Sequence, residues 1–196
     1  MAKTDLQSLL SASAMTTAEA LSFYDSLEPV DLAFITGRWQ GKGISTNHPM
    51  DGILEMICWY GKEFIDAETV HPLLFKNTQG EIFKLRPDPT VMAFSLNFRI
   101  NRYPWIAPGL RWFTSFFKTE VSQARLRMME SRGVVTATMI YDYLPINDSF
   151  KKIDDNSVFG LMDYKPIPQP FSFCCNGVCF ESDKFCPYLL LITAVI

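Results

Sequence analysis

The stretch Gly37-Arg38-Trp39-Gln40-Gly41-Lys42-Gly43 decides the fold expected of this chain. Glycine weakens a strand, so glycines at alternate positions indicate that the strand bends or that another backbone approaches closely. Trp39 is suited to close one end of a barrel as a packed, hydrogen-bonded side chain. The stretch therefore predicts the first strand of a small β-barrel that holds a ligand.

The composition is that of one globular domain. The chain has 196 residues, of which 48% are hydrophobic, 14% aromatic and 20% charged, and this length is ample for a core. Its 16 Phe exceed what a small core usually needs and suggest a lined cavity. The net charge of -3, with both signs interspersed, lacks the basic patch that binds a phosphate backbone, so we expect no nucleic acid partner.

Targeting signals and cysteines indicate the compartment. The first twenty residues lack the apolar segment of a secretory signal. The longest apolar run, residues 189–196, is shorter than the roughly 18 residues of a membrane-spanning helix. The five cysteines are an odd number, four of them in the last quarter of the chain, and do not describe a secreted disulfide framework. We expect a cytoplasmic protein without a transmembrane segment.

Short helices are expected around the first strand and over the barrel mouth. Thr16 and Glu19 have the spacing of a capping box and predict a helix over residues 17–27. Asp51 is expected to cap a second helix over residues 53–58. The aromatic segment 105–117 could be a portal helix, a membrane-touching patch or core, and core is the favoured interpretation.

Alternating apolar and polar residues predict hairpins over residues 69–85, 123–143 and 149–164. Strands at short, regular spacing with polar turns favour an antiparallel barrel over alternating β and α units. The expected fold is mainly β, an antiparallel calycin-like barrel with a short N-terminal helix and one or two short helices over its mouth.

Several motifs resemble a known family. Gly37-Arg38-Trp39-Gln40-Gly41, residues 59–64 (WYGKEF) and residues 70–73 (VHPL) resemble the family named for its G-x-W-x-G motif. Residues 124–127 (ARLR), 132–135 (RGVV), 137–142 (ATMIYD), 144–148 (LPIND) and 160–163 (GLMD) are similar to the uncharacterised domain that usually follows it. The resemblance covers about residues 30–171 and implies a barrel of unknown function.

The opening strand also resembles, more distantly, those of nitrobindins, lipocalins and fatty-acid-binding proteins, which are ligand-holding barrels. Nitrobindins bind haem through a histidine late in the chain, whereas the last histidine here is His71.

The chain departs from the family after Phe171. We therefore expect an N-terminal extension and helix over residues 1–30 and one barrel domain over residues 31–171, with halves 31–90 and 120–171. A divergent tail, residues 172–196, would replace the closing strand and invite self-association.

The candidate ligand-binding side chains are aromatic or polar groups near the expected cavity: Trp39, Trp59, Tyr60, Lys62, His71 and Tyr141. Tyr60 and Lys62 could present a phenol and an ammonium group to a ligand carboxylate. His48 and His71 supply only two nitrogens in no recognisable metal-ligand spacing, so we expect no metal site.

The leading hypothesis is a cytoplasmic binding protein for a small hydrophobic or amphipathic molecule, without a cofactor. The alternative is a cyclase, isomerase or hydrolase acting on an apolar substrate in the same cavity. Its acid and base groups would come from His71, Tyr141, Asp142 and Asp148. A third hypothesis is haem binding through His71.

Overall fold

A computed structural model describes residues 15–77, 79–98 and 100–178. The strands within these residues are β1 (Glu28–Pro29), β2 (Gly37–Ile44), β3 (Trp59–Phe64), β4 (Val70–Lys76), β5 (Ile82–Lys84), β6 (Ala124–Ser131), β7 (Val134–Tyr141), β8 (Ile146–Asp154), β9 (Ser157–Tyr164) and β10 (Ile167–Gly177). The helices are α2 (Thr17–Ser26), α3 (Leu32–Ile35), α4 (Ile53–Met56), α5 (Pro89–Asn97), α6 (Ala107–Thr114) and the 3-10 turns Ile100–Arg102, Pro104–Ile106 and Ser115–Phe117.

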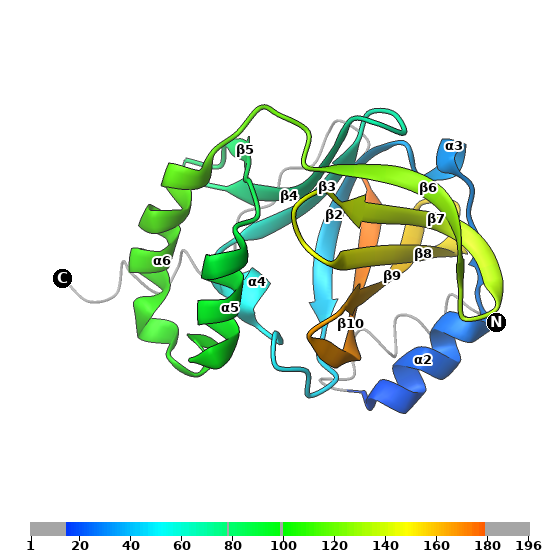
Figure 1. The fold of residues 1–196 in the computed structure, drawn as a ribbon, viewed down its shortest axis with the longest axis horizontal. Helices are drawn as coiled ribbons and strands as arrows, with labels where there is room; N and C mark the ends of the chain where they lie inside the picture. Colours follow the sequence, from blue (N-terminus) through cyan, green and yellow to red (C-terminus); the bar gives the residue numbers. More distant parts are fainter. Residues whose placement is uncertain (1–14, 78, 99, 179–196) are drawn as a thin grey trace.

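The strands close into an antiparallel barrel (Figure 1). The order is β8-β7-β6-β4-β3-β2-β10-β9, and β9 pairs back with β8 to complete the ring. The short strands β1 and β5 extend it by pairing with β8 and β4. Closure removes the unpaired strand edges of an open sheet, and the mainly β barrel expected from the sequence is confirmed.

The hairpin turns have the expected chemistry. Residues 124–131 pair in register with residues 134–141 around Arg132 and Gly133, which have φ of 52° and 80°. Positive φ at both central residues is the turn geometry that matches the twist of the flanking strands. The predicted hairpins over residues 123–143 and 149–164 are confirmed as β6–β7 and β8–β9.

Strand β10 closes the barrel, although the sequence predicted a divergent tail in place of the closing strand. Residues 172–177 pair with residues 39–44 of β2 on one side, and β9 lies on the other side. The boundary expected at Phe171 therefore falls inside a strand, and the barrel continues to Gly177. The physical reason is that both faces of β10 are buried: Phe171 and Phe173 join the interior core, whereas Cys174 packs in the outer core with residues of α2. The rest of the expected tail, residues 179–196, lies outside the described residues.

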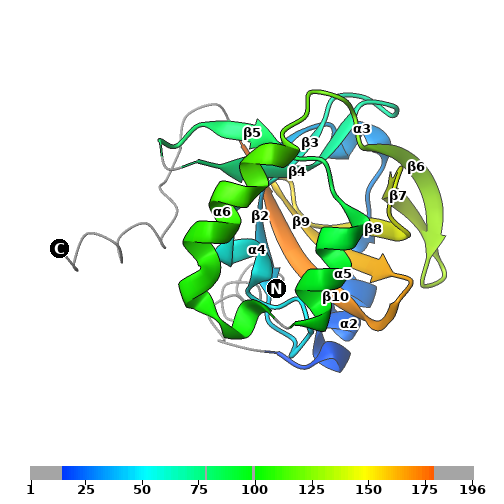
Figure 2. The same cartoon turned by 60° about the vertical axis from the view of Figure 1, so that its left-hand side comes forward.

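Helices cover the outside of the barrel and one of its ends. The α2 helix begins with the predicted capping box between Thr16 and Glu19, and it buries Tyr24 against the outer face near β9. The α4 helix begins at Ile53 without a side-chain cap, because the Asp51 carboxylate accepts from the backbone N–H of Thr46 and His48 instead. Helices α5 and α6 lie on opposite sides of the end of the barrel (Figure 2).

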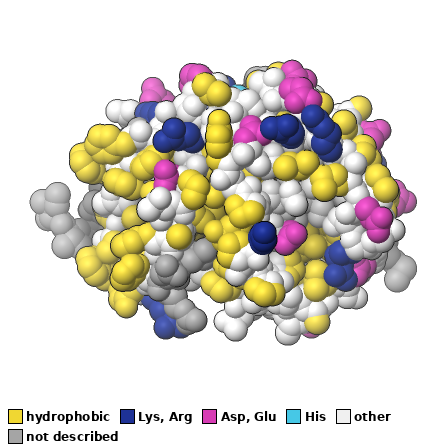
Figure 3. Space-filling view, in the orientation of Figure 1, with side chains coloured by type: hydrophobic (Ala, Val, Ile, Leu, Met, Phe, Trp, Pro, Cys, Tyr) yellow, Lys and Arg dark blue, Asp and Glu magenta, His cyan; other side chains and the backbone are white. Residues whose placement is uncertain are grey.

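The aromatic segment over the mouth is largely exposed, so the favoured interpretation of it as core is wrong. Trp105 and Trp112 are 77% and 68% exposed, and hydrophobic side chains gather over this end of the molecule (Figure 3). Among the described residues, no helix is both long and apolar enough to cross a membrane.

Candidate functional site

An apolar cavity of about 130 Å³ lies inside the barrel below α5 and α6. Its walls come from α4 to α6 and from the inward faces of the strands. Apolar lining residues include Met50, Ile53, Leu54, Ile57, Leu73, Phe75, Leu85, Met92, Phe113, Phe117, Leu144, Ile146, Met162, Phe171 and Phe173. The polar lining side chains include Lys62, Tyr141 and Asp148, which come from three different strands.

A register shift in β3 places Lys62 in the cavity. The pairing of β3 with β4 shifts on both sides of Gly61, so Trp59 and Lys62 both line the cavity although they are three positions apart. Gly61 has a φ of 151°, and a Cβ at this position would collide with the backbone oxygen of Trp39. Only glycine fits such a close approach of two backbones, so Gly61 is the local reason why Lys62 points inward.

Lys62 and Asp148 form a buried ion pair. Lys62 Nζ lies 2.7 Å from Asp148 Oδ2, and the two residues are 3% and 1% exposed. Nζ also donates to the carbonyl oxygen of Pro72 at 3.4 Å and lies 5.0 Å from the ring centroid of Phe173. Burial opposes the Lys62 charge, but the Asp148 carboxylate prevails and raises the Lys62 pKa. Burial raises the pKa of the Asp148 carboxyl group, against the opposite effect of Lys62.

Other polar groups surround this pair. The Tyr141 ring centroid lies 5.8 Å from Lys62 Nζ, and burial raises the pKa of its phenol. Burial also raises the pKa of the Cys175 thiol, which keeps it protonated at neutral pH. Asp148 Oδ1 and Trp59 Nε1 are buried and have no hydrogen-bond partner among the described residues. Such groups are rare in proteins and call for an explanation.

Two of the candidate residues named from the sequence support the fold instead of lining the cavity. Trp39 is buried and donates from Nε1 to the carbonyl oxygen of Ile35 at 2.7 Å. Tyr60 is buried, with Lys76 Nζ 4.9 Å from its ring centroid. The structure does not bring Tyr60 and Lys62 together around a ligand carboxylate, because only Lys62 lines the cavity and its ammonium group is paired with Asp148.

Two further candidates, His71 and Asp142, lie outside the cavity lining. His71 pairs in register with Glu63 and lies outside the cavity lining. Burial and the Lys84 charge lower its pKa. Asp142 forms an ion pair with Arg125 at 2.7 Å on the outer surface. The acid and base set suggested for an enzyme is thus split, and the position of His71 does not support haem ligation inside the barrel.

Most of the apolar residues that line the cavity were not among the candidates named from the sequence. They include Leu144, Met162, Phe171 and Phe173. The alternation of Phe171 and Phe173 in β10 was an available signal, because alternate residues of a strand share a face. Within the described part of the chain, no group of three or more His, Cys, Asp or Glu side chains is placed to hold a metal ion.

Two family models match the chain in tandem. The first, described as GXWXG protein, matches residues 22–80, and the second, described as Domain of unknown function (DUF4334), matches residues 122–176. The chain therefore carries a GXWXG segment followed by a segment similar to the domain of unknown function. A comparison with curated proteins found no match. A crystal structure of a protein from Thermomonospora curvata is similar, with 28% identity, a TM-score of 0.68, and coverage of 91% of this chain and 99% of that chain.

The buried ion pair joins the two segments that the family models match. Lys62 and Trp59 lie in the first segment, and Tyr141 and Asp148 lie in the second. Residues 81–121, between the matched segments, contribute α5 and α6, which cover the cavity. The two segments therefore form one barrel around one site, a fold compatible with ligand binding.

Proposed function

We propose that this protein binds a small hydrophobic or amphipathic molecule inside its barrel and works in the cytoplasm. The observation that carries the proposal is the cavity, with largely apolar walls and a buried polar cluster around Lys62 and Asp148; Arg86 and Asp88 also line it. Ligand sites of this kind use apolar walls for affinity and a few convergent polar groups for orientation.

The size of the cavity limits the ligand. A cavity of about 150 Å³ lined by aliphatic and aromatic side chains stays dry and binds benzene. The cavity of about 130 Å³ therefore suits a molecule of about one ring, or a short branched chain. A longer ligand would need α5 and α6 to move apart.

Native mass spectrometry of protein purified from cells, followed by solvent extraction, tests the proposal directly. A titration with benzene and its small derivatives, followed by ligand-observed NMR, tests it in vitro. Leu73→Trp fills the cavity and is expected to weaken binding at least roughly tenfold, since overpacked sites exclude ligands. Val135→Trp, on an exposed position of β7, is the matched control and leaves binding unchanged. A protein that emerges empty and binds none of the probes contradicts the proposal.

A further inference from the structure

The polar cluster at the bottom of the cavity carries no net charge. Lys62 is neutralised by Asp148 at 2.7 Å, and Tyr141 keeps its proton because burial raises its pKa. A carboxylate ligand would add an uncompensated charge beside Asp148. Burying a charge without a partner is unfavourable in a protein interior, so the cluster disfavours anionic ligands.

Two polar atoms of the same cluster have no hydrogen-bond partner within the part of the chain that the structure describes. Trp59 Nε1 is a donor only, whereas Asp148 Oδ1 of the ionised carboxylate is an acceptor only. Lys62 Nζ lies 5.5 Å from the Trp59 ring centroid and 2.7 Å from the other Asp148 oxygen, so both unpaired atoms belong to side chains around one ammonium group. A hydroxyl group can accept one hydrogen bond and donate another, and it therefore matches what the cluster lacks.

We propose that the ligand class of this site is small neutral alcohols or phenols, whose hydroxyl group accepts from Trp59 Nε1 and donates to Asp148 Oδ1. This inference rests on the proposed function and specifies the ligand. A neutral hydroxyl compound replaces the carboxylate ligand expected from the sequence, because the ammonium group of Lys62 already has its counter-ion.

Benzene, phenol and benzoate are matched probes for this proposal, and isothermal titration calorimetry measures their affinities. Phenol is expected to bind more tightly than benzene, and benzoate at least about tenfold more weakly than phenol. Trp59→Phe keeps a ring but removes the N–H, and is expected to lower the phenol-to-benzene affinity ratio by roughly two- to tenfold. Trp105→Phe, the same change at an exposed position, leaves the ratio unchanged.

A second variant removes the charges without leaving one unpaired. Lys62→Met combined with Asp148→Leu is expected to reduce the preference for phenol over benzene, because only Trp59 Nε1 then remains to bind the hydroxyl group. The inference is overturned if benzene and phenol bind equally to the unmodified protein, or if benzoate binds most tightly, and the proposed function then still stands. If none of the three probes binds, the inference fails, and the proposed function fails with it when the protein purified from cells is also empty.

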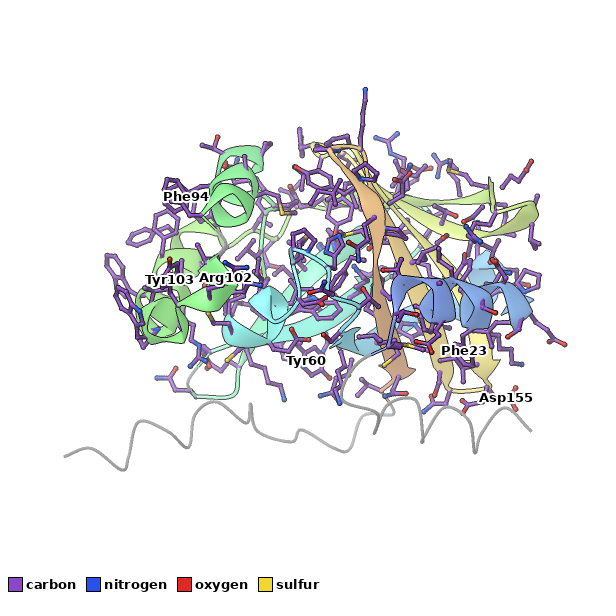
Figure 4. The ribbon with its side chains drawn as sticks, turned by 90° about the horizontal axis from the view of Figure 1, so that it is seen from below. Phe23, Tyr60, Phe94, Arg102, Tyr103 and Asp155 are labelled. Atoms are coloured by element: carbon purple, nitrogen blue, oxygen red, sulfur yellow. The ribbon has the colours of Figure 1, made fainter. Side chains whose placement is uncertain are left out.

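A different observation, the exposed aromatic face of the helical segment, supports a second inference. The face consists of Phe94, Phe98, Tyr103, Trp105, Trp112, Phe113 and Phe116, each at least 42% exposed. Phe94, Arg102 and Tyr103 lie at the helical end of the molecule, far from Phe23 and Asp155 (Figure 4). Large exposed apolar patches of this kind mark interaction sites.

The charges of this segment point to the partner. Residues 89–118 contain three Arg and one Lys and no Asp or Glu, although the whole chain has a net charge of -3. Trp, Tyr and Phe combined with basic residues are typical of surfaces that lie in the interface of anionic membranes. Helices α5 and α6 also line the cavity through Met92 and Phe113, so the same face borders the cavity mouth.

We infer that the helical end docks onto an anionic lipid surface, with the cavity mouth toward the membrane. Sedimentation with phosphatidylcholine vesicles, with and without phosphatidylserine, measures the fraction of protein that binds to the vesicles. Binding is expected only with phosphatidylserine, and Trp105→Ser combined with Trp112→Ser is expected to weaken it at least roughly tenfold. Arg102→Gln is expected to weaken it roughly fivefold.

Tyr143→Ser, at an exposed aromatic position of the barrel, is the control and leaves vesicle binding unchanged. Binding that needs no phosphatidylserine, or that survives the double tryptophan variant, overturns the inference. So does a dimer that forms through this face in the absence of any vesicle binding.

Discussion

Breaking the buried ion pair is expected to be among the most destabilising changes in this protein. Asp148→Leu removes the carboxylate and leaves the Lys62 ammonium group 3% exposed and 5.0 Å from the Phe173 ring centroid. Removing one partner of a buried pair costs about 3–5 kcal/mol, because the other charge stays buried without compensation. Lys62→Met is expected to cost less, since the Asp148 carboxyl group, whose pKa burial raises, can take up a proton.

Replacing both residues tests the reasoning. Lys62→Met with Asp148→Leu removes both charges of the buried pair, and such double replacements are often neutral or stabilising by about 1–4 kcal/mol. The coupling free energy from the double-mutant cycle is therefore expected to exceed about 2 kcal/mol. Urea unfolding at pH 7, followed by tryptophan fluorescence and circular dichroism, gives the free energies of unfolding.

The matched control is the surface pair Arg125 and Asp142, whose side chains are 48% and 22% exposed at the same N–O distance of 2.7 Å. Its coupling is expected to be at most about 1 kcal/mol, because water screens it. The reasoning is refuted if Asp148→Leu costs less than about 1 kcal/mol, or if the double variant costs the sum of the single ones.

Further predictions concern the fold around the site. Trp39→Phe leaves the Ile35 carbonyl group unpaired and is expected to cost about 1–3 kcal/mol of unfolding free energy, with ligand affinity unchanged in a titration. Gly61→Ala is expected to cost more than about 4 kcal/mol of unfolding free energy, because its Cβ would collide with backbone. Its control is Gly133→Ala, where φ is 80° and the space around the Cβ is open, and the expected cost is about 1–2 kcal/mol. Equal losses of the two variants in urea unfolding would contradict this prediction. Burial lowers the pKa of His48 below its ordinary value of 6.5. The unfolded chain then binds more protons, so this stability is complete above pH 6.5 and is lost as the pH falls toward the lower native pKa. His48→Gln should therefore flatten the decline of the unfolding free energy between pH 7.5 and 5.5.

Local sequence patterns were enough to predict most of the strands and turns. The alternation over residues 124–141 predicts β6 and β7 because the side-chain period of a strand is two residues, and Arg132-Gly133 predicts the turn because glycine tolerates positive φ. The same reasoning failed at β10, because residues 171–175 are buried on both faces and neither face is marked by exposed polar residues. It also failed for the aromatic helices, because periodicity does not tell a core face from an exposed apolar one.

The sequence by itself determined the class of this protein: a G-x-W-x-G strand, antiparallel hairpins and a chain long enough for one barrel. It also named Lys62, Trp59, Tyr141 and Asp148 as candidates. Only the tertiary structure decided that these four share a cavity, while Trp39, Tyr60, His71 and Asp142 do not. The reason is geometric. A register shift at Gly61 turns Lys62 inward, and closure of the barrel brings it to Asp148, 86 positions away along the chain. Neither relation is encoded in the local spacing of residues.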